Sequence, residues 1–151
     1  MDNTRSLMRV SQDDAVLEAI AALESDIFED AWSKREIAST TSQANAICGV
    51  IKEGDSVLGY FLSYYVLDEC ELARIAVDKN IRKSGVGQQL FAYMKELCKE
   101  KQVERILLDV RESNDAAIRF YEKQGFQVDG RRKGYYQGEH PEDAILMSLF
   151  I

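Results

Sequence analysis

The sequence predicts a single domain of the α/β or α+β class, and three observations support this prediction. The chain has 151 residues, which suits one domain. With 46% hydrophobic and 30% charged residues, its composition is that of a globular protein. Helical patterns alternate with β-rich runs, as in folds that pack helices around one sheet. We therefore expect residues 1–151 to form one domain, without repeats or long linkers.

The first part of the chain predicts two helices. Residues 13–29 have helical periodicity after an acidic start, and Ser33 is placed to cap a short helix after Trp32. The apolar residues at helical spacing in the first of these helices are Val16, Leu17, Ile20, Leu23, Ile27 and Phe28.

Strands are expected next. Residues 46–68 are β-rich on both sides of a turn at 53–55, and 71–78 predict a third strand. A helix follows to about Lys101. Its expected inner stripe is Val86, Leu90, Phe91, Met94, Leu97 and Cys98.

The last part of the chain predicts a strand, a helix and two more strands. Residues 105–111 form a continuous apolar run, which favours burial on both faces. Ser113 or Asn114 is expected to cap the next helix and Gly125 to end it. The final strands are expected at 126–133 and 143–150, around the loop GYYQGEHPE.

Charge and cysteine content narrow the function classes. The formal net charge of −7 repels phosphate backbones, so no direct nucleic-acid partner is expected. No segment approaches the ~20 apolar residues of a membrane span, and the start lacks a secretory signal, so no membrane partner is expected. Cys48, Cys70 and Cys98 form no CxxC pair and are predicted to be reduced, buried thiols in a cytoplasmic protein without a metal.

The stretch Arg82-Lys83-Ser84-Gly85-Val86-Gly87 lies between a predicted strand and helix. The first N–H groups of a helix lack partners and the macrodipole is positive there, so such an end binds phosphate where glycines let it approach. A tight turn that needs glycine is the plain alternative. The stretch lacks the Gly-Lys-Ser/Thr of nucleotide triphosphate loops, and Leu90 replaces the third glycine of a dinucleotide fingerprint.

Longer motifs identify a family. The segments ELARIAVDKNIRKSGVGQQL, LLDVRESNDAAIRFYEKQGFQVDGRRKGYY and EDAILMSL resemble the GNAT superfamily of acetyl-CoA-dependent N-acetyltransferases, and within it the bacterial ribosomal-protein-alanine N-acetyltransferases. DAWS at 30–33 is similar to their Pro-Trp-Ser motif, with Ala31 in place of proline. The resemblance implies a GNAT fold, with a mixed, mostly antiparallel sheet flanked by helices.

The resemblance also implies the acetyl-CoA site. The strand backbone would run beside the pantetheine arm, the loop and helix start would surround the pyrophosphate, and Asn114 would contact the cofactor, although it is a good helix cap in any case. The residues carried over are Ile75, Ala76, Val77, Arg82, Lys83, Ser84, Gly85, Val86, Gly87, Gln88 and Asn114.

Two catalytic residues follow from the same motifs. Tyr121 would be the general acid for the departing thiolate, with core packing as its alternative role. Asp109 occupies the position of the family's glutamate base and is one methylene shorter, so a water or Glu71 would share the task. Because an unpaired buried carboxylate is costly, Asp109 is expected either to pair with Arg74 or Arg111 or to be functional.

The implied partner is the N-terminal peptide of a small-subunit ribosomal protein. The acidic run Asp68 to Glu71 would receive its cationic tail or be a solvated turn, and Tyr135-Tyr136 would wall the channel or be edge-strand aromatics. His140, the one histidine, is expected to be an exposed loop residue. Another GNAT substrate, such as a small amine, polyamine or different protein N-terminus, and a non-catalytic acyl-CoA sensor remain as alternatives.

Overall fold

A computed structural model describes residues 4–82 and 84–151. Its elements, in chain order, are β1 (Arg5–Arg9), α1 (Asp14–Ile27), α2 (Lys34–Thr41), β2 (Ala46–Glu53), β3 (Ser56–Val66), β4 (Glu69–Val77), the 3₁₀ helix η1 (Lys79–Ile81), α3 (Val86–Glu100), β5 (Arg105–Arg111), α4 (Asp115–Lys123), β6 (Gln127–Tyr136) and β7 (Glu142–Phe150).

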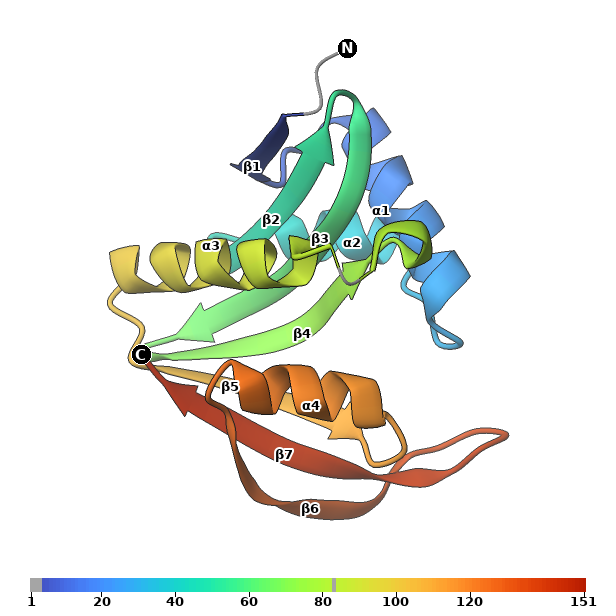
Figure 1. Cartoon of the computed structure of the whole chain (residues 1–151), viewed down its shortest axis with the longest axis vertical. Coiled ribbons are helices and arrows are strands. Elements are labelled where there is room, and N and C mark those ends of the chain that lie inside the picture. Colours follow the sequence, from blue (N-terminus) through green and yellow to red (C-terminus); the bar gives the residue numbers. More distant parts are fainter. Residues whose placement is uncertain (1–3, 83) are drawn as a thin grey trace.

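The strands form one sheet in the order β1-β2-β3-β4-β5-β7-β6. All neighbouring strands are antiparallel except β4 and β5, which pair in parallel only over Glu69–Glu71 with Arg105–Leu107. Beyond Glu71 these two strands diverge (Figure 1). The predicted mixed, mostly antiparallel sheet is confirmed, and its one parallel junction opens toward the carboxyl ends of β4 and β5.

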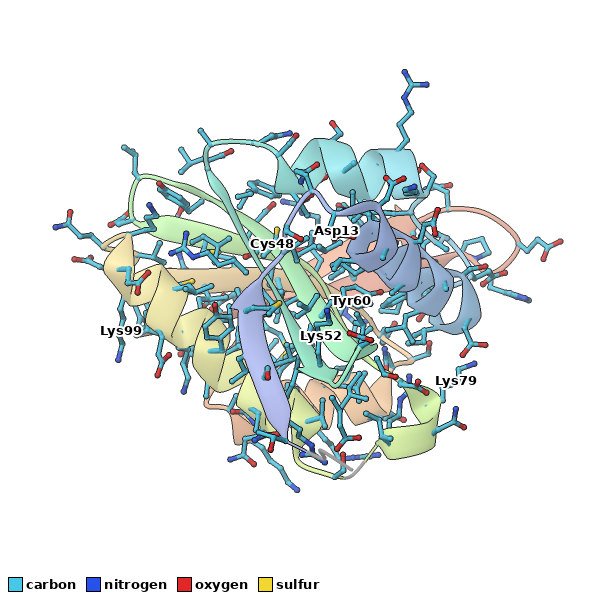
Figure 2. All side chains as sticks on the ribbon, turned by 90° about the horizontal axis from the view of Figure 1, so that it is seen from above. Asp13, Cys48, Lys52, Tyr60, Lys79 and Lys99 are labelled. Atoms are coloured by element: carbon cyan, nitrogen blue, oxygen red, sulfur yellow. The ribbon has the colours of Figure 1, made fainter. Side chains whose placement is uncertain are left out.

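Helices α1 and α2 cover one face of the N-terminal half of the sheet, while α3 and α4 lie on the opposite face (Figure 1). Figure 2 shows Cys48 and Tyr60 between α1 and the strands, where both are buried. The α1 prediction is confirmed, and Asp13 caps this helix by accepting the N–H of Ala15 at 2.7 Å. Ser33 caps α2 in a reciprocal capping box with Glu36, as expected.

The second core lies between the sheet and helices α3 and α4. All six residues predicted for the inner stripe of α3 are buried in it. Phe91 packs edge-to-face on Phe120 of α4, with ring centroids 6.4 Å apart, which ties the two helices together. This core positions the start of α3 beside the diverging strands β4 and β5.

The structure corrects two predictions about the strands and adds a strand that was not predicted. Strand β5 is buried on one face only, because its side chains alternate between the core and the open side of the sheet. Strand β6 extends to Tyr136, so Tyr135 and Tyr136 belong to a strand and not to a loop. Strand β1 was not predicted, since RSLMR is short, carries two arginines and forms an exposed edge.

Cys48, Cys70 and Cys98 are buried and free, as predicted. Burial raises the pKa of the Cys48 thiol to about 11, so this thiol is protonated at neutral pH. Among the described residues, no helix combines the length and apolar character needed to cross a bilayer.

Candidate active site

Helix α3 begins without a side-chain cap. Gly85 occupies its N-cap position with φ +84°, and no side-chain hydrogen bond closes this end within the described residues. The other three α-helices are capped by Asp13, Ser33 and Asn114. The first N–H groups of α3 and the positive end of its dipole therefore face outward, which is the arrangement that binds an anion.

The two glycines of this loop have different surroundings. A Cβ atom added to Gly85 would meet nothing within 4 Å, so the space beside this backbone is open. A Cβ atom added to Gly87 would meet the Phe120 ring at 3.4 Å and Val77 at 3.7 Å, which are ordinary van der Waals distances. Gly85 therefore gives access to the backbone, whereas Gly87 lies against α4 and β4.

The remaining loop residues surround this helix start. Val86 is buried, whereas Arg82, Ser84 and Gln88 are exposed, and Arg82 donates from Nε to the Val77 carbonyl at 3.4 Å. Lys83, also predicted here, lies outside the described residues.

Arg5 of β1 also reaches this loop and was missed by sequence reasoning. Its Nη1 donates to the Ser84 carbonyl at 3.2 Å and to Gln89 Oε1 at 3.0 Å. A contact across 79 positions leaves no local sequence signal. Arg5 therefore adds a second arginine, after Arg82, near the loop, and its hydrogen bonds connect the loop to the edge strand β1.

The predicted strand segment Ile75-Ala76-Val77 lies where β4 has separated from β5. Its other edge pairs with β3, in the register Tyr60↔Ala76 and Phe61↔Ile75. The register of this pair shifts between Leu62↔Arg74 and Ser63↔Leu72, which leaves Ala73 as a bulge. The β5-facing edge of this segment can therefore offer its backbone groups to a ligand.

Asp109 of β5 projects from the open face of the sheet and is exposed, which corrects the expectation of a buried carboxylate. Arg74 pairs with Glu24 and Asp30, and Arg111 pairs with Glu142, so neither expected arginine is an ion-pair partner of Asp109. The negative charge of Asp109 contributes to the raised pKa values of Tyr64 and Tyr136, so Asp109 lies near both tyrosines.

Tyr121 of α4 is buried, with 8% of its surface exposed, and packs against Phe120 and Phe126. Burial, followed by the nearby Tyr136, raises the pKa of Tyr121. The hydroxyl is therefore a protonated donor at neutral pH. The core packing weighed from the sequence is confirmed, and the general-acid role stays a prediction.

Asn114 is the N-cap of α4, and its Oδ1 accepts the N–H of Ala117 at 3.2 Å. The capping role considered from the sequence is confirmed. The cap uses only the side-chain oxygen, and the amide nitrogen takes no part in it. Asn114 lies at the carboxyl end of β5, on the α4 side of the divergence between β4 and β5.

Tyr64 and Glu71 form a pair on the open face, in directly opposed positions of β3 and β4. The Tyr64 hydroxyl donates to a Glu71 carboxylate oxygen. This hydrogen bond, with a smaller contribution from burial, raises the pKa of Tyr64 to about 12. Glu71 was considered from the sequence as a second carboxylate, and it shares the face of Asp109.

Tyr136 stands over Arg111, with the guanidinium carbon 4.3 Å from the ring centroid. Burial and then Asp109 raise the pKa of Tyr136 to about 12, and Asp30 of the α1–α2 loop contributes.

Possible ligand atoms of Glu29, Glu139 and His140, all exposed, lie within 4.8 Å of one another. The loop after α1 and the loop between β6 and β7 thus meet above the open face, and His140 is exposed as expected.

A buried charge fixes the α1–α2 loop. Glu24 is fully buried and accepts the Tyr60 hydroxyl at 2.7 Å and the Trp32 N–H at 2.8 Å. Arg74 forms an ion pair with Glu24, with Nε 3.4 Å from Oε1, and its guanidinium carbon lies 4.5 Å from the Phe28 ring centroid. Sequence reasoning missed Glu24, since a glutamate in an amphipathic helix is usually solvated.

Comparison with protein families finds the model described as "Acetyltransferase (GNAT) family", which matches residues 17–126. A curated relative from Escherichia coli K12, a [ribosomal protein bS18]-alanine N-acetyltransferase, is 33% identical over 121 residues, which are 80% of this chain and 81% of the relative.

Solved structures of acetyltransferases are also similar to this chain. The crystal structure of the ribosomal-protein-S18-alanine N-acetyltransferase from Escherichia coli is similar with a TM-score of 0.88 and 28% identity, over 98% of this chain and 94% of that one. An acetyltransferase from Bacillus anthracis, solved with acetyl coenzyme A, has a TM-score of 0.69 and 28% identity, over 76% of this chain and 68% of that one.

Proposed function

Since the chain belongs to the GNAT acetyltransferase family, we propose that it is an acetyl-CoA-dependent N-α-acetyltransferase that modifies the N-terminal alanine of a small-subunit ribosomal protein. The observation that carries this proposal is the uncapped start of α3 at Gly85, beside a β4 segment that has left its parallel neighbour. The E. coli relative of the same name supports the choice of substrate.

The chain's own groups fit acetyl-CoA. The N–H groups at the start of α3 would hold the pyrophosphate, with Arg82, Ser84 and Gln88 around it. The free edge of Ile75–Val77 would run beside the pantetheine arm, and the amide nitrogen of Asn114 would add a contact. Positive charge and hydrogen-bond donors therefore lie together at the proposed position of the negatively charged pyrophosphate.

The proposed chemistry is direct transfer. The uncharged α-amine attacks the thioester carbonyl, a C–N bond forms and the C–S bond breaks. A backbone N–H near Val77 stabilises the oxyanion. Asp109, through a water or with Glu71, accepts the proton lost by the amine. Tyr121 donates its proton to the departing thiolate.

An N-terminal α-amine on a cationic peptide agrees with the acidic side chains of the open face and with Asp109 as the base. An α-ammonium has a pKa of about 7.7–8.0, against about 10.4 for lysine, so an exposed aspartate is an adequate base for an N-terminus. Glu71, Asp109 and Asp30 favour a cationic peptide, and the net charge of −7 disfavours a nucleic-acid partner. The three free, buried thiols suit the reducing cytosol.

The first experiment measures binding of acetyl-CoA by calorimetry. Gly85→Val is expected to abolish the heat of binding, because its side chain fills the open space beside the helix start. Gly54→Val is the matched control, since Gly54 also has a positive φ (+60°) and open surroundings but lies in the β2–β3 turn. Equal binding by both variants would contradict the proposed pyrophosphate site.

The second experiment compares acceptors. A short peptide beginning Ala-Arg is expected to be acetylated on its N-terminus, with spermidine and free lysine as competing acceptors and intact mass as the readout. Rapid turnover of spermidine without turnover of the peptide would identify a small-amine enzyme. Acetyl-CoA binding without acetylation of any acceptor would indicate an acyl-CoA sensor.

A further inference from the structure

The turn between β3 and β4 presents an apolar side chain in an unusual conformation. Leu67 has φ +56° and is 85% exposed. Bulky residues rarely adopt this left-handed region, where glycine or asparagine is usual. The turn is held in place, because the Asp68 carbonyl accepts the N–H groups of Glu104 at 2.7 Å and Arg105 at 3.2 Å. The leucine is therefore presented on a fixed backbone.

Two more exposed apolar side chains lie on the same end of the sheet. Val66, Glu69, Arg105 and Phe150 are successive partners across β3, β4, β5 and β7, so they form one row on the open face. Val66 is 63% exposed and Phe150 is 66% exposed. Glu69 and Arg105 lie between Val66 and Phe150 in this row, so the apolar residues form two parts, Val66 with Leu67 and Phe150 alone. We call Val66, Leu67 and Phe150 together the end patch.

The charged neighbours of the end patch, along the chain and across the strands, are three carboxylates and Arg105. Arg105 forms ion pairs with Glu69 at 3.2 Å and Asp129 at 3.4 Å, and its guanidinium stacks on Phe150. The carboxylates of Asp68, Glu69 and Asp129 thus lie at the rim. A second copy of this acidic chain would bring like charges together, whereas a cationic partner would match the rim.

The end patch is continuous with the candidate active site. The next row on the open face contains Tyr64, Glu71 and Leu107, and Asp109 lies one row further along β5. Each row is two residues from the next, so the end patch is about 13 Å from the row of Asp109. An extended peptide covers that distance in about four residues.

We propose that the end patch is a second contact site for the acceptor polypeptide. This inference rests on the proposed function and adds a determinant of specificity. With its amine at the site, the acceptor extends along the open face past Glu71 and Glu69 and places an apolar side chain from its fourth or fifth residue on one part of the end patch, at Leu67 or at Phe150. The occupant is therefore a cationic segment with an apolar residue near that position.

The test uses three peptides with a common start. The first is Ala-Arg-Gly, the second is Ala-Arg-Gly-Gly-Leu-Arg-Gly-Lys, and the third has serine in place of leucine at its fifth position. For the unmodified enzyme, we expect kcat/KM for the leucine peptide to exceed that for the other two by about tenfold, mainly through a lower KM.

Variants identify the surface responsible. The double variant Leu67→Ser/Phe150→Ser is expected to lose this tenfold difference and to keep the same kcat/KM for Ala-Arg-Gly. Val128→Ser is the matched control, because Val128 is 57% exposed but pairs with Met147 on the opposite face of the sheet. This control should retain the full difference between the peptides.

Each outcome is decisive. A preference for the leucine peptide that survives in the double variant, or that is absent from the unmodified enzyme, overturns the inference and leaves the proposed function intact. Acetylation of none of the three peptides overturns both. If sedimentation shows a dimer that only the double variant dissociates, the end patch is an interface between copies, and the inference is wrong.

Discussion

The two halves of the sheet, separated where β4 and β5 diverge, are covered differently. Strands β2 and β3 have α1 and α2 on one face and α3 on the other, so most of their side chains are buried. Strands β5, β6 and β7 have α4 on one face only and carry charged and aromatic side chains on the other. The first half supplies most of the fully buried strand residues, and the second carries Asp109 and Tyr121, the two residues proposed for proton transfer.

This division predicts that substitutions in the covered half act on stability. Phe61 is fully buried in β3, and Phe61→Ala is expected to lower the free energy of unfolding by about 3–5 kcal/mol. Phe150→Ala, on the open half with 66% of Phe150 exposed, should change it by no more than about 0.5 kcal/mol. Chemical denaturation measures the free energy of unfolding of both variants. Equal losses would contradict the division of the sheet into a covered and an open half.

Tyr121 tests whether α4 contributes to chemistry as well as to packing. Tyr121→Phe is expected to lower kcat by about 10²–10³-fold, since it removes the proposed proton donor, while affinity for acetyl-CoA is retained. Tyr93→Phe is the control, because Tyr93 packs against the same core from α3. Unchanged turnover in the Tyr121 variant would leave this residue with a packing role alone.

Asp109 tests whether a residue on the open face affects activity without affecting stability. Asp109→Asn is expected to lower kcat/KM by about tenfold, less than the usual loss of a general base, because an α-amine is already partly neutral near pH 7.5. Its melting temperature should not change, since the side chain is exposed. Asp55→Asn, in the exposed β2–β3 turn, controls for the loss of one charge.

The smallest expected effect concerns alkaline pH. The rate should rise to about pH 8 as the acceptor amine loses its proton, then change by less than about twofold to pH 10. The plateau follows because burial raises the pKa of Tyr121, so the donor stays protonated. Above about pH 10, tyrosines ionise more readily in the unfolded chain than at Tyr60 and Tyr121, and stability declines. Activity and circular dichroism across this range separate the two processes.

The sequence predicted what local patterns encode. Periodicity identified the six inward residues of α3, and capping chemistry identified Ser33 and Asn114. The apolar composition of β5 did not reveal which face would lack a helix, so the exposure of Asp109 was mispredicted. The pairing of Tyr64 with Glu71 and the contact of Arg5 with Ser84 depend on register and tertiary packing, which no local pattern records.

The buried Glu24 has a consequence for redesign of acceptor selectivity. Its bonds to Tyr60, Trp32 and Arg74 join α1, the following loop and two strands into one unit, so a library of substitutions there would mostly yield unfolded protein. The segment 134–141, which meets the loop after α1, consists mainly of exposed side chains. Among the described contacts it has no buried ion pair like that of Glu24. Directed evolution toward new N-termini should therefore randomise the β6–β7 hairpin and leave the α1–α2 segment unchanged.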